Sequence, residues 1–310
     1  MSKKVLFFGD PGIDDAIALI YAHFNDDIDI VGIVAEYGNV SKEKATENIR
    51  YLLQRVGRTD IKIFGGAERP LTGETPYFYP EVHGVEGLGY VSPPGPPEAF
   101  ENFFNVVDLI KQYQDEIIIV STGRPTSLAT LFILYKNLMT HIKSFYIMGG
   151  AFFFPGNVTP VSEANFHGDP VAADIVLRYA QNVYLYPLNV THYAVVTPEM
   201  VNIINDAGKS DLIKPMMDYY YYNFYQEKYP ALQGAPVHDL LTLMAVLGKD
   251  MFQYSESKVV VDQSEGATRG QSIGNFRPED LLKEYDYPVH RIAFRFDYTQ
   301  FYRELMTTLT

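Results

Sequence analysis

The chain has no cysteine in its 310 residues. Disulfides, thiolate metal ligands and cysteine nucleophiles are therefore excluded, and a reducing compartment is compatible with this composition. Any metal bound by side chains must be held by oxygen or imidazole groups.

Basic residues are also scarce. The sequence has 25 Lys and Arg against 38 Asp and Glu, which gives a formal net charge of −13 at pH 7. A protein this acidic repels a phosphate backbone unless basic residues gather in one place, and the sequence has no such cluster. We therefore expect no nucleic acid polymer among its partners.

Long hydrophobic runs are missing as well. The first apolar run, residues 5–8, is broken at once by Gly9, Pro11 and Gly12. No run reaches the ~18 apolar residues that a membrane-spanning helix needs. We therefore expect no signal peptide, no membrane contact and a cytoplasmic location.

What the chain does contain is an alternation of short β-branched or aromatic runs with amphipathic stretches. The expected strands are residues 5–8, 28–35, 61–64, 117–121, 144–148, 183–186 and 290–296. The expected helices are residues 14–24, 42–56, 100–112, 126–136 and 170–180. This order predicts a single α/β domain over residues 1–310, with a doubly wound, mostly parallel sheet flanked by helices and the active site at the carboxyl ends of its strands.

Three segments interrupt this alternation. Residues 68–98 are rich in Pro and Gly, residues 149–169 form a Gly/Asn/Pro loop, and residues 208–236 combine a tyrosine-rich helix with a loop. Loops of this length in a compact domain are usually functional.

Polar residues gather where the expected strands end. Asp10 follows the first strand, and Asp14 and Asp15 begin the next helix. Three carboxylates this close repel one another unless a cation or protons neutralise them, so they outline a hard-cation site. Acidic residues are equally common at helix N-termini without a metal, and this motif alone leaves both interpretations open. Comparable polar or glycine-rich positions are residues 38–39, 121–127, 148–150 and 238–239.

A series of motifs in fixed order carries a resemblance to a known family. They are DPGIDDAIAL at 10–19, GNV at 38–40, HGVEGLG at 83–89, TGRPTSLA at 122–129, MGGAFFFPGNVTPVSEANFHGDP at 148–170, GAPVHD at 234–239 and ATRGQS at 267–272. With these motifs the chain resembles the inosine-uridine-preferring nucleoside hydrolases, which are calcium-dependent N-ribohydrolases. The resemblance extends over nearly the whole chain.

The resemblance implies roles for individual residues. Asp10 is the implied base that takes a proton from the attacking water, and His238 is the implied proton donor to the departing base. His83 matches a second histidine found in part of the family and is a candidate substrate-binding residue, and which of the two histidines is the leaving-group acid stays open. The implied Ca²⁺ ligands are Asp10, Asp15, Asp239 and the backbone carbonyl of Thr126. The implied ribose-binding residues are Asp14, Asn39, Met148, Asn157, Glu163 and Asn165.

The chain departs from the family pattern at several positions. Phe8 stands where members usually have another Asp, which leaves the support of Asp10 open. Arg124 and Pro125 replace a common Pro-Leu pair, and Ala164 stands where an aromatic residue is often found.

A tyrosine-rich stretch offers a candidate base-binding surface. Tyr222, Tyr225 and Tyr229 have helical spacing on one face. Such a face can stack on a nucleobase, or it can serve ordinary packing or a subunit contact. We take Tyr222 and Tyr225 as candidate base-binding residues, while His83 could also be a plain loop histidine.

These groups match the needs of N-glycosidic bond cleavage. The reaction passes through an oxocarbenium-like sugar, so an enzyme must hold the ribose, activate water and help the base to leave. We therefore expect the protein to hydrolyse ribonucleosides. As a separate expectation, it forms a homo-oligomer, dimer or tetramer. A hydrolase of another N-riboside, such as a nicotinamide or modified nucleoside, and a non-catalytic protein that binds calcium or ribose remain alternatives. The sequence does not decide between purines and pyrimidines.

Overall fold

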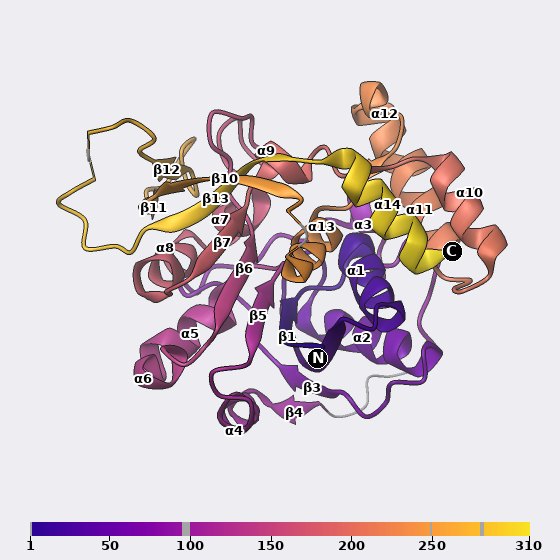
Figure 1. The fold of residues 1–310 in the computed structure, drawn as a ribbon, viewed down its shortest axis with the longest axis horizontal. Helices are drawn as coiled ribbons and strands as arrows, with labels where there is room; N and C mark the ends of the chain where they lie inside the picture. Colours follow the sequence, from indigo (N-terminus) through magenta and orange to yellow (C-terminus); the bar gives the residue numbers. More distant parts are fainter. Residues whose placement is uncertain (1, 95–99, 249, 280–281) are drawn as a thin grey trace.

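A nine-stranded sheet forms the centre of the protein in the computed structural model, which describes residues 2–94, 100–248, 250–279 and 282–310 (Figure 1). Residues 95–98 of the predicted loop 68–98 lie outside the described residues. The strand order is β10-β13-β7-β6-β5-β1-β2-β3-β4, and all neighbours pair in parallel except β10 with β13. The strands are β1 (Lys3–Gly9), β2 (Ile28–Ala35), β3 (Lys62–Gly65), β4 (Glu101–Asn102), β5 (Ile118–Ser121), β6 (Ser144–Met148), β7 (Val183–Tyr186), β10 (Phe252–Ser257) and β13 (His290–Phe296). Two small antiparallel sheets pair β8 (Val195–Val196) with β9 (Ala235–Pro236) and β11 (Val259–Val261) with β12 (Ser272–Gly274).

Helices cover both faces of the central sheet (Figure 1). One face packs against α1 (Ile13–Phe24), α2 (Lys42–Arg55), α10 (Pro198–Ala207), α11 (Ile213–Tyr220), α13 (His238–Met244) and α14 (Tyr298–Leu309). The other packs against α4 (Val106–Gln112), α5 (Thr126–Leu134) and α8 (Pro170–Tyr179). Shorter elements are α3 (Pro80–His83), η1 (Phe103–Asn105), α6 (Lys136–Met139), α7 (Ala164–Gly168), α9 (Leu188–Thr191), η2 (Tyr221–Tyr225), α12 (Gln226–Lys228), η3 (Pro230–Leu232) and η4 (Ala245–Leu247).

Strand β1 shows how the sequence produces these layers. Val5 and Phe7 belong to the core between the sheet and α1, whereas Leu6 and Phe8 belong to the core on the α5 side. Because helices bury both faces, the strand is apolar throughout and does not alternate with polar residues.

The order of the strands creates a ligand site. The chain runs from β1 through β2 and β3 to β4 at one edge, then returns to β5 on the other side of β1. The connections that leave β1 and β5 therefore diverge, and in doubly wound folds ligands bind in the crevice at such carboxyl ends.

The predicted fold class is confirmed, and strands 28–35, 144–148, 183–186 and 290–296 have the predicted bounds. The predicted helix 100–112 is wrong in its first part, which forms β4 and the 3₁₀ turn η1 before α4 begins. Phe100 packs so closely on β3 that a Cβ atom at Gly65 would lie 2.3 Å from its ring, which anchors this segment to the sheet edge.

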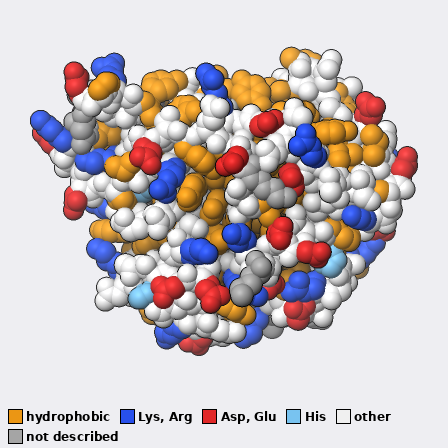
Figure 2. All heavy atoms as spheres, viewed as in Figure 1, with side chains coloured by type: hydrophobic (Ala, Val, Ile, Leu, Met, Phe, Trp, Pro, Cys, Tyr) orange, Lys and Arg blue, Asp and Glu red, His pale blue; other side chains and the backbone are white. Residues whose placement is uncertain are grey.

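On the face drawn in Figure 2, Lys and Arg side chains are interspersed with Asp and Glu among hydrophobic side chains. Among the helices of the described residues, no segment has the length and apolar character required to span a membrane.

Candidate active site

A cavity lies at the carboxyl ends of the central strands, where the change in winding direction predicts a ligand site. Polar groups and rings make up most of its lining, together with the aliphatic side chains of Val82, Met148, Val158, Ala164 and Leu188. Carboxyl, amide and hydroxyl groups come from Asp14, Asn39, Thr122, Asn157, Glu163, Asn165 and Asp239. Aromatic and imidazole rings come from Tyr79, His83, His192, Tyr220, Phe224, Tyr225, Tyr229 and His238.

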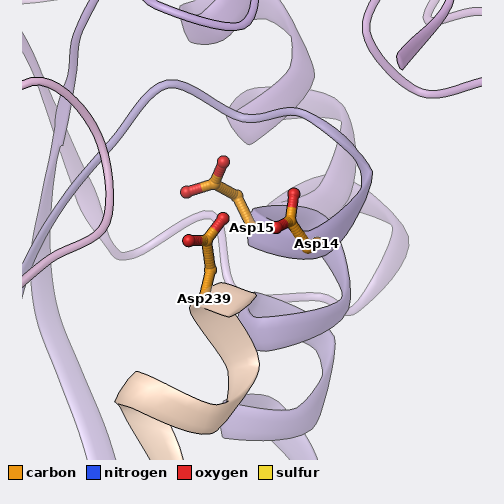
Figure 3. Close-up of side chains that lie close together, drawn as sticks. All are labelled: Asp14, Asp15 and Asp239. Carbon is orange, nitrogen blue, oxygen red and sulfur yellow. The ribbon is translucent and has the colours of Figure 1, made fainter. Parts of the chain in front are cut away.

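Three buried aspartates meet at this cavity. Asp14 and Asp15 lie in the first turn of α1, and Asp239 lies in the first turn of α13, which packs beside α1. Figure 3 shows the three side chains turned toward one another, and one carboxylate oxygen from each lies within 4.8 Å of the others. The two helices thus join residues from opposite ends of the chain.

This cluster has the charge and the donors of a cation site. Burial raises the pKa of Asp14 to about 7 and that of Asp15 to about 6, and burial together with the Asp14 charge raises the pKa of Asp239 well above its ordinary value. The carboxylates therefore cannot all be charged without a counterion. Asp14 Oδ1 is buried without a hydrogen-bond partner in the described part of the chain. A set of oxygen donors fits a hard cation such as Ca²⁺.

Asp10 lies beside this cluster in a tight backbone pocket. Its Oδ2 accepts a hydrogen bond from the Asn39 N–H (2.7 Å), while its buried Oδ1 has no partner among the described residues. A Cβ atom added at Gly38 would lie 1.6 Å from Asp10 Oδ2, so glycine is needed there. A Cβ atom added at Gly123 would lie 3.0 Å from Asp10 Oδ1. Burial raises the pKa of Asp10 well above its ordinary value, and the charge of Asp15 adds to this rise.

Phe8 does not leave Asp10 unsupported. The Phe8 ring is fully buried in the core on the α5 side, and the Phe8 carbonyl oxygen accepts a hydrogen bond from the backbone N–H of Thr122 (2.9 Å). The side chain of Asp10 is held instead by Asn39, on the segment that follows β2.

The structure does not bring the predicted calcium ligand Thr126 to the cavity. The Thr126 hydroxyl is bonded to Tyr37 (2.9 Å) and Asp169 (2.7 Å). Its carbonyl oxygen accepts a hydrogen bond from Thr130 inside α5 (2.9 Å). The hydroxyl and the carbonyl oxygen of Thr126 are therefore both hydrogen-bonded to residues that do not line the cavity.

Thr122 occupies the place next to the acidic cluster that was predicted for Thr126. It lines the cavity directly after β5, and its hydroxyl donates to Asp15 Oδ1 (2.7 Å). Its carbonyl oxygen accepts a hydrogen bond from Asn165 Nδ2 (2.7 Å). Thr122, and not Thr126, is therefore the threonine next to the acidic cluster.

The segment after β6 brings its predicted ribose-binding residues to the cavity, namely Met148, Asn157, Glu163 and Asn165. Glu163 caps α7: Oε1 accepts from Asn165 N–H (2.7 Å), and Oε2 accepts from Gly150 N–H (3.0 Å) and Phe166 N–H (3.2 Å). Burial raises the pKa of Glu163 to about 7. Asn157 Oδ1 accepts from the Ala164 N–H (2.9 Å), so the loop is fixed by its own polar groups.

His238 belongs to a chain of hydroxyl groups. Its Nδ1 is 2.9 Å from the Thr191 hydroxyl and its Nε2 is 3.5 Å from the Tyr225 hydroxyl, which is 3.5 Å from the Tyr220 hydroxyl. Burial lowers the pKa of His238 to about 3, so the ring is neutral at pH 7.

His83 is built into the cavity wall. The Ile13 N–H donates to His83 Nδ1 (3.1 Å), and the His83 ring stacks on Tyr220 with 5.4 Å between ring centres. Burial lowers the pKa of His83 to about 3. The backbone bond to Nδ1 leaves the proton on Nε2.

The tyrosine-rich segment is not a regular helix. A π-helical turn, η2, follows α11 and shifts the residues after it. Tyr225 and Tyr229 line the cavity, whereas Tyr222 is 51% exposed and lies outside the lining. The structure thus brings Tyr225, but not Tyr222, to the predicted place.

Some lining residues were not singled out from the sequence, namely Tyr79, Val82, Leu188, His192, Tyr220 and Phe224. Leu188 follows β7 so closely that the strand-end rule could have found it. Tyr79, Val82 and His192 lie on loops and short helices that carry no periodic pattern. Tyr220 and Phe224 belong to the tyrosine-rich stretch, in which the helical spacing indicated Tyr222, Tyr225 and Tyr229 instead.

The chain is similar to known proteins over most of its length. The profile of the inosine-uridine preferring nucleoside hydrolase family matches residues 5–303. Uridine nucleosidase 1 of Arabidopsis thaliana is 32% identical over 289 residues, covering 92% of this chain and 84% of that protein. The pyrimidine-specific ribonucleoside hydrolase RihA of Escherichia coli O9:H4 (strain HS) is 33% identical over 281 residues, 89% of each chain.

The fold is shared with a solved structure. The purine-preferring ribonucleoside hydrolase from Gardnerella vaginalis matches with a TM-score of 0.89 and 29% identity, over 99% of this chain and 98% of that one. The chain therefore belongs to the inosine-uridine preferring nucleoside hydrolase family, as its motifs predict, and it is a nucleoside hydrolase.

Proposed function

We propose that this enzyme hydrolyses the N-glycosidic bond of ribonucleosides to ribose and a free nucleobase, with Ca²⁺ and Asp10 activating the water. The observation that carries the proposal is the buried cluster of Asp14, Asp15 and Asp239, at a cavity that is also lined by aromatic rings. Beside it lies Asp10 Oδ1, which has no hydrogen-bond partner within the described part of the chain. This places carboxylates for a cation and a base next to rings that suit a flat nucleobase.

The acidic residues have two proposed roles next to the sugar, namely binding the cation and accepting a proton. We propose that Asp10, Asp15, Asp239 and the Thr122 carbonyl hold Ca²⁺. Asp14, Asp15 and Asp239 form the observed carboxylate cluster, and Asn39 links it to Asp10 by donating to both Asp10 Oδ2 and Asp15 Oδ2. A bound Ca²⁺ supplies a positive charge that orients sugar hydroxyls and lowers the pKa of water. Asp10 takes the proton of the attacking water on Oδ1, because Oδ2 is held by Asn39.

The polar loop residues hold the ribose. Asn157 uses its Oδ1 within the loop, so its Nδ2 remains to donate to a sugar hydroxyl. Asn165 uses its Nδ2 for Thr122, so its Oδ1 remains to accept. Asp14, Asn39 and Glu163 complete this group. Such fixed contacts orient the ring for attack and strengthen as positive charge develops on the sugar.

We propose that His238 and Tyr225 act as a pair that donates a proton to the departing base. Because the free His238 ring is neutral at pH 7, the proton given up is the one shared between His238 Nε2 and the Tyr225 hydroxyl, and solvent replaces it after the base has left. Replacing His238 by alanine should then lower kcat about 10²-fold for inosine and uridine, whose bases leave poorly without a proton. For nitrophenyl riboside, whose leaving group needs no proton, the loss should be far smaller. Steady-state kinetics on both substrates checks this, and equal losses would count against proton donation.

Two tyrosines offer a matched test of base binding. Tyr225→Phe removes a hydroxyl inside the cavity and should raise KM or lower kcat about 10-fold, whereas Tyr222→Phe removes an exposed hydroxyl and should leave both constants unchanged. Initial rates over a range of nucleoside concentrations separate the two. A larger loss for Tyr222→Phe would contradict the placement of this segment.

A turnover panel tests the proposed function itself. The purified protein should release reducing sugar from at least one of inosine, adenosine, guanosine, uridine and cytidine. Release from nicotinamide riboside alone would favour a hydrolase of another N-riboside. Ribose binding without any turnover would favour a non-catalytic protein. Because the named relatives include uridine, pyrimidine and purine enzymes, the same panel also measures base preference.

A further inference from the structure

An arginine lies buried beside the acidic groups of the site. Arg124 is 3% exposed, and it stands where the family pattern commonly has proline. Burial raises the pKa of both Asp10 and Glu163, and the positive charge of Arg124 opposes that rise in each. The guanidinium is therefore close enough to act on both carboxylates.

The contacts of Arg124 join two segments at the rim of the cavity. Nη2 donates to the carbonyl oxygen of Tyr77 (2.6 Å) and, more weakly, to that of Gly38 (3.4 Å). The guanidinium carbon lies 4.8 Å from the ring centre of Tyr37 and 6.0 Å from that of Tyr79. A planar cation that both stacks on tyrosines and bonds two carbonyls holds its neighbours in one arrangement.

The segment held in this way carries cavity residues. Tyr79 lines the cavity, and its N–H donates to the Asn39 carbonyl (3.1 Å). The Tyr79 carbonyl accepts from the N–H groups of Val82 and His83 in α3 (both 3.1 Å). Arg124 therefore lies at the start of a chain of contacts that runs through residues 77–79 to Asn39 and His83.

The Arg124 side chain packs closely against the end of α7. A Cβ atom at Gly168 would lie 2.3 Å from Arg124 Nε, so glycine there lets α7 approach the guanidinium. Arg124 is thus in contact with the segments after β2, before α3 and at the end of α7, all of which surround the cavity.

We propose that Arg124 is a positioning residue that fixes residues 77–83 against the sugar-binding side of the cavity, so that substrate affinity depends on it more than turnover does. The inference rests on the proposed function for its kinetic readout. It does not rest on that function for its structural readout, the hydrogen exchange of this segment.

The test compares Arg124→Gln and Arg124→Lys with Arg303→Gln, which removes the same charge at an exposed position on α14. Both Arg124 variants should raise KM for the preferred nucleoside about 10-fold and change kcat less than about 3-fold. Amide hydrogen exchange of residues 77–83 in the ligand-free protein should become faster in both. Lysine should not rescue, because it keeps the charge but loses the stacking and the planar fork. Arg303→Gln should match the wild type.

Three results would overturn the proposal: KM and exchange both unchanged, a fall in kcat with KM unchanged, or full rescue by lysine, which would show that charge alone matters. If the Arg124 variants fail to fold, Tyr79→Leu provides a second test, because it removes one stacking partner of Arg124 and leaves Arg124 in place. This variant should also raise KM, and an unchanged KM would count against the proposal. If the wild type hydrolyses no nucleoside, the proposed function fails, and the exchange data still decide the role of Arg124.

Discussion

Asp10→Asn is expected to lower kcat about 10³-fold while ribose still binds, because an amide cannot take the proton of the attacking water. The substitution keeps the size of the side chain and leaves an oxygen that can accept from the Asn39 N–H, so the local backbone should hold. Reducing-sugar release gives kcat and KM, and calorimetry with ribose gives the binding. Cation affinity should also fall, because Asp10 is a proposed ligand.

A matched control is Asp174→Asn. Asp174 is also buried, but it lies on α8 and accepts hydrogen bonds from Tyr287, away from the cavity lining. This variant should lose thermal stability and keep its kcat. If Asp10→Asn keeps the kcat of the wild type, Asp10 is not the base.

Removal of divalent cations is expected to reduce kcat/KM about 10²-fold or more, and Ca²⁺ should restore it. Without a cation, the carboxylates of Asp14, Asp15 and Asp239 repel one another or bind protons, and the sugar hydroxyls lose a point of attachment. Activity in excess chelator, followed by calcium addition, is the measurement. Full activity in the chelator would exclude the metal.

The same cluster makes stability depend on pH in a defined direction. Burial raises the pKa of Asp14 to about 7 and of Asp15 to about 6, so the folded, ion-free protein binds protons that the unfolded chain has already released. For these groups, stability is therefore greatest below about pH 4 and falls as the pH rises to about 7. Because a cation competes with those protons, the gain in Tm on adding calcium should be larger at about pH 8 than at about pH 5. An equal gain at both would contradict the cluster as the binding site.

The fold was predictable because both faces of the sheet are buried. Flat apolar strands such as β1 and β6 and amphipathic helices such as α2 carry their signal locally. The start of the predicted helix 100–112 was wrong because the pairing of β4 with β3 depends on a distant contact, Phe100 on Gly65. No local pattern reports such a contact.

The site was predictable where it follows strand ends and less so elsewhere. Asp10, Asn39 and Met148 lie at the end of a strand or shortly after one. Asn39 and Met148 line the cavity, and Asp10, which is not among the lining residues, accepts a hydrogen bond from the Asn39 N–H. Thr122 and Thr126 share one short motif, and only the end of β5 at Ser121 tells which of them faces the acidic cluster. A motif gives the residue type and cannot give the turn geometry.

The position of Tyr222 depends on one irregular turn. A regular helix would place Tyr222 and Tyr225 on one face, but the π-helical turn η2 separates them. This turn depends on how the segment packs over the cavity, with Asn223 bonded to Tyr90 and Tyr220 stacked on His83. Helical periodicity does not report such packing.

The most direct test of the metal site is a crystal structure of the protein grown with calcium chloride and ribose, with the ion located by its anomalous scattering. The account predicts one ion with carboxylate oxygens of Asp10, Asp15 and Asp239 and the carbonyl oxygen of Thr122 at about 2.3–2.6 Å, and ribose hydroxyls on the same ion. An ion bound elsewhere, or ribose bound in the cavity with no ion between these aspartates, would contradict it.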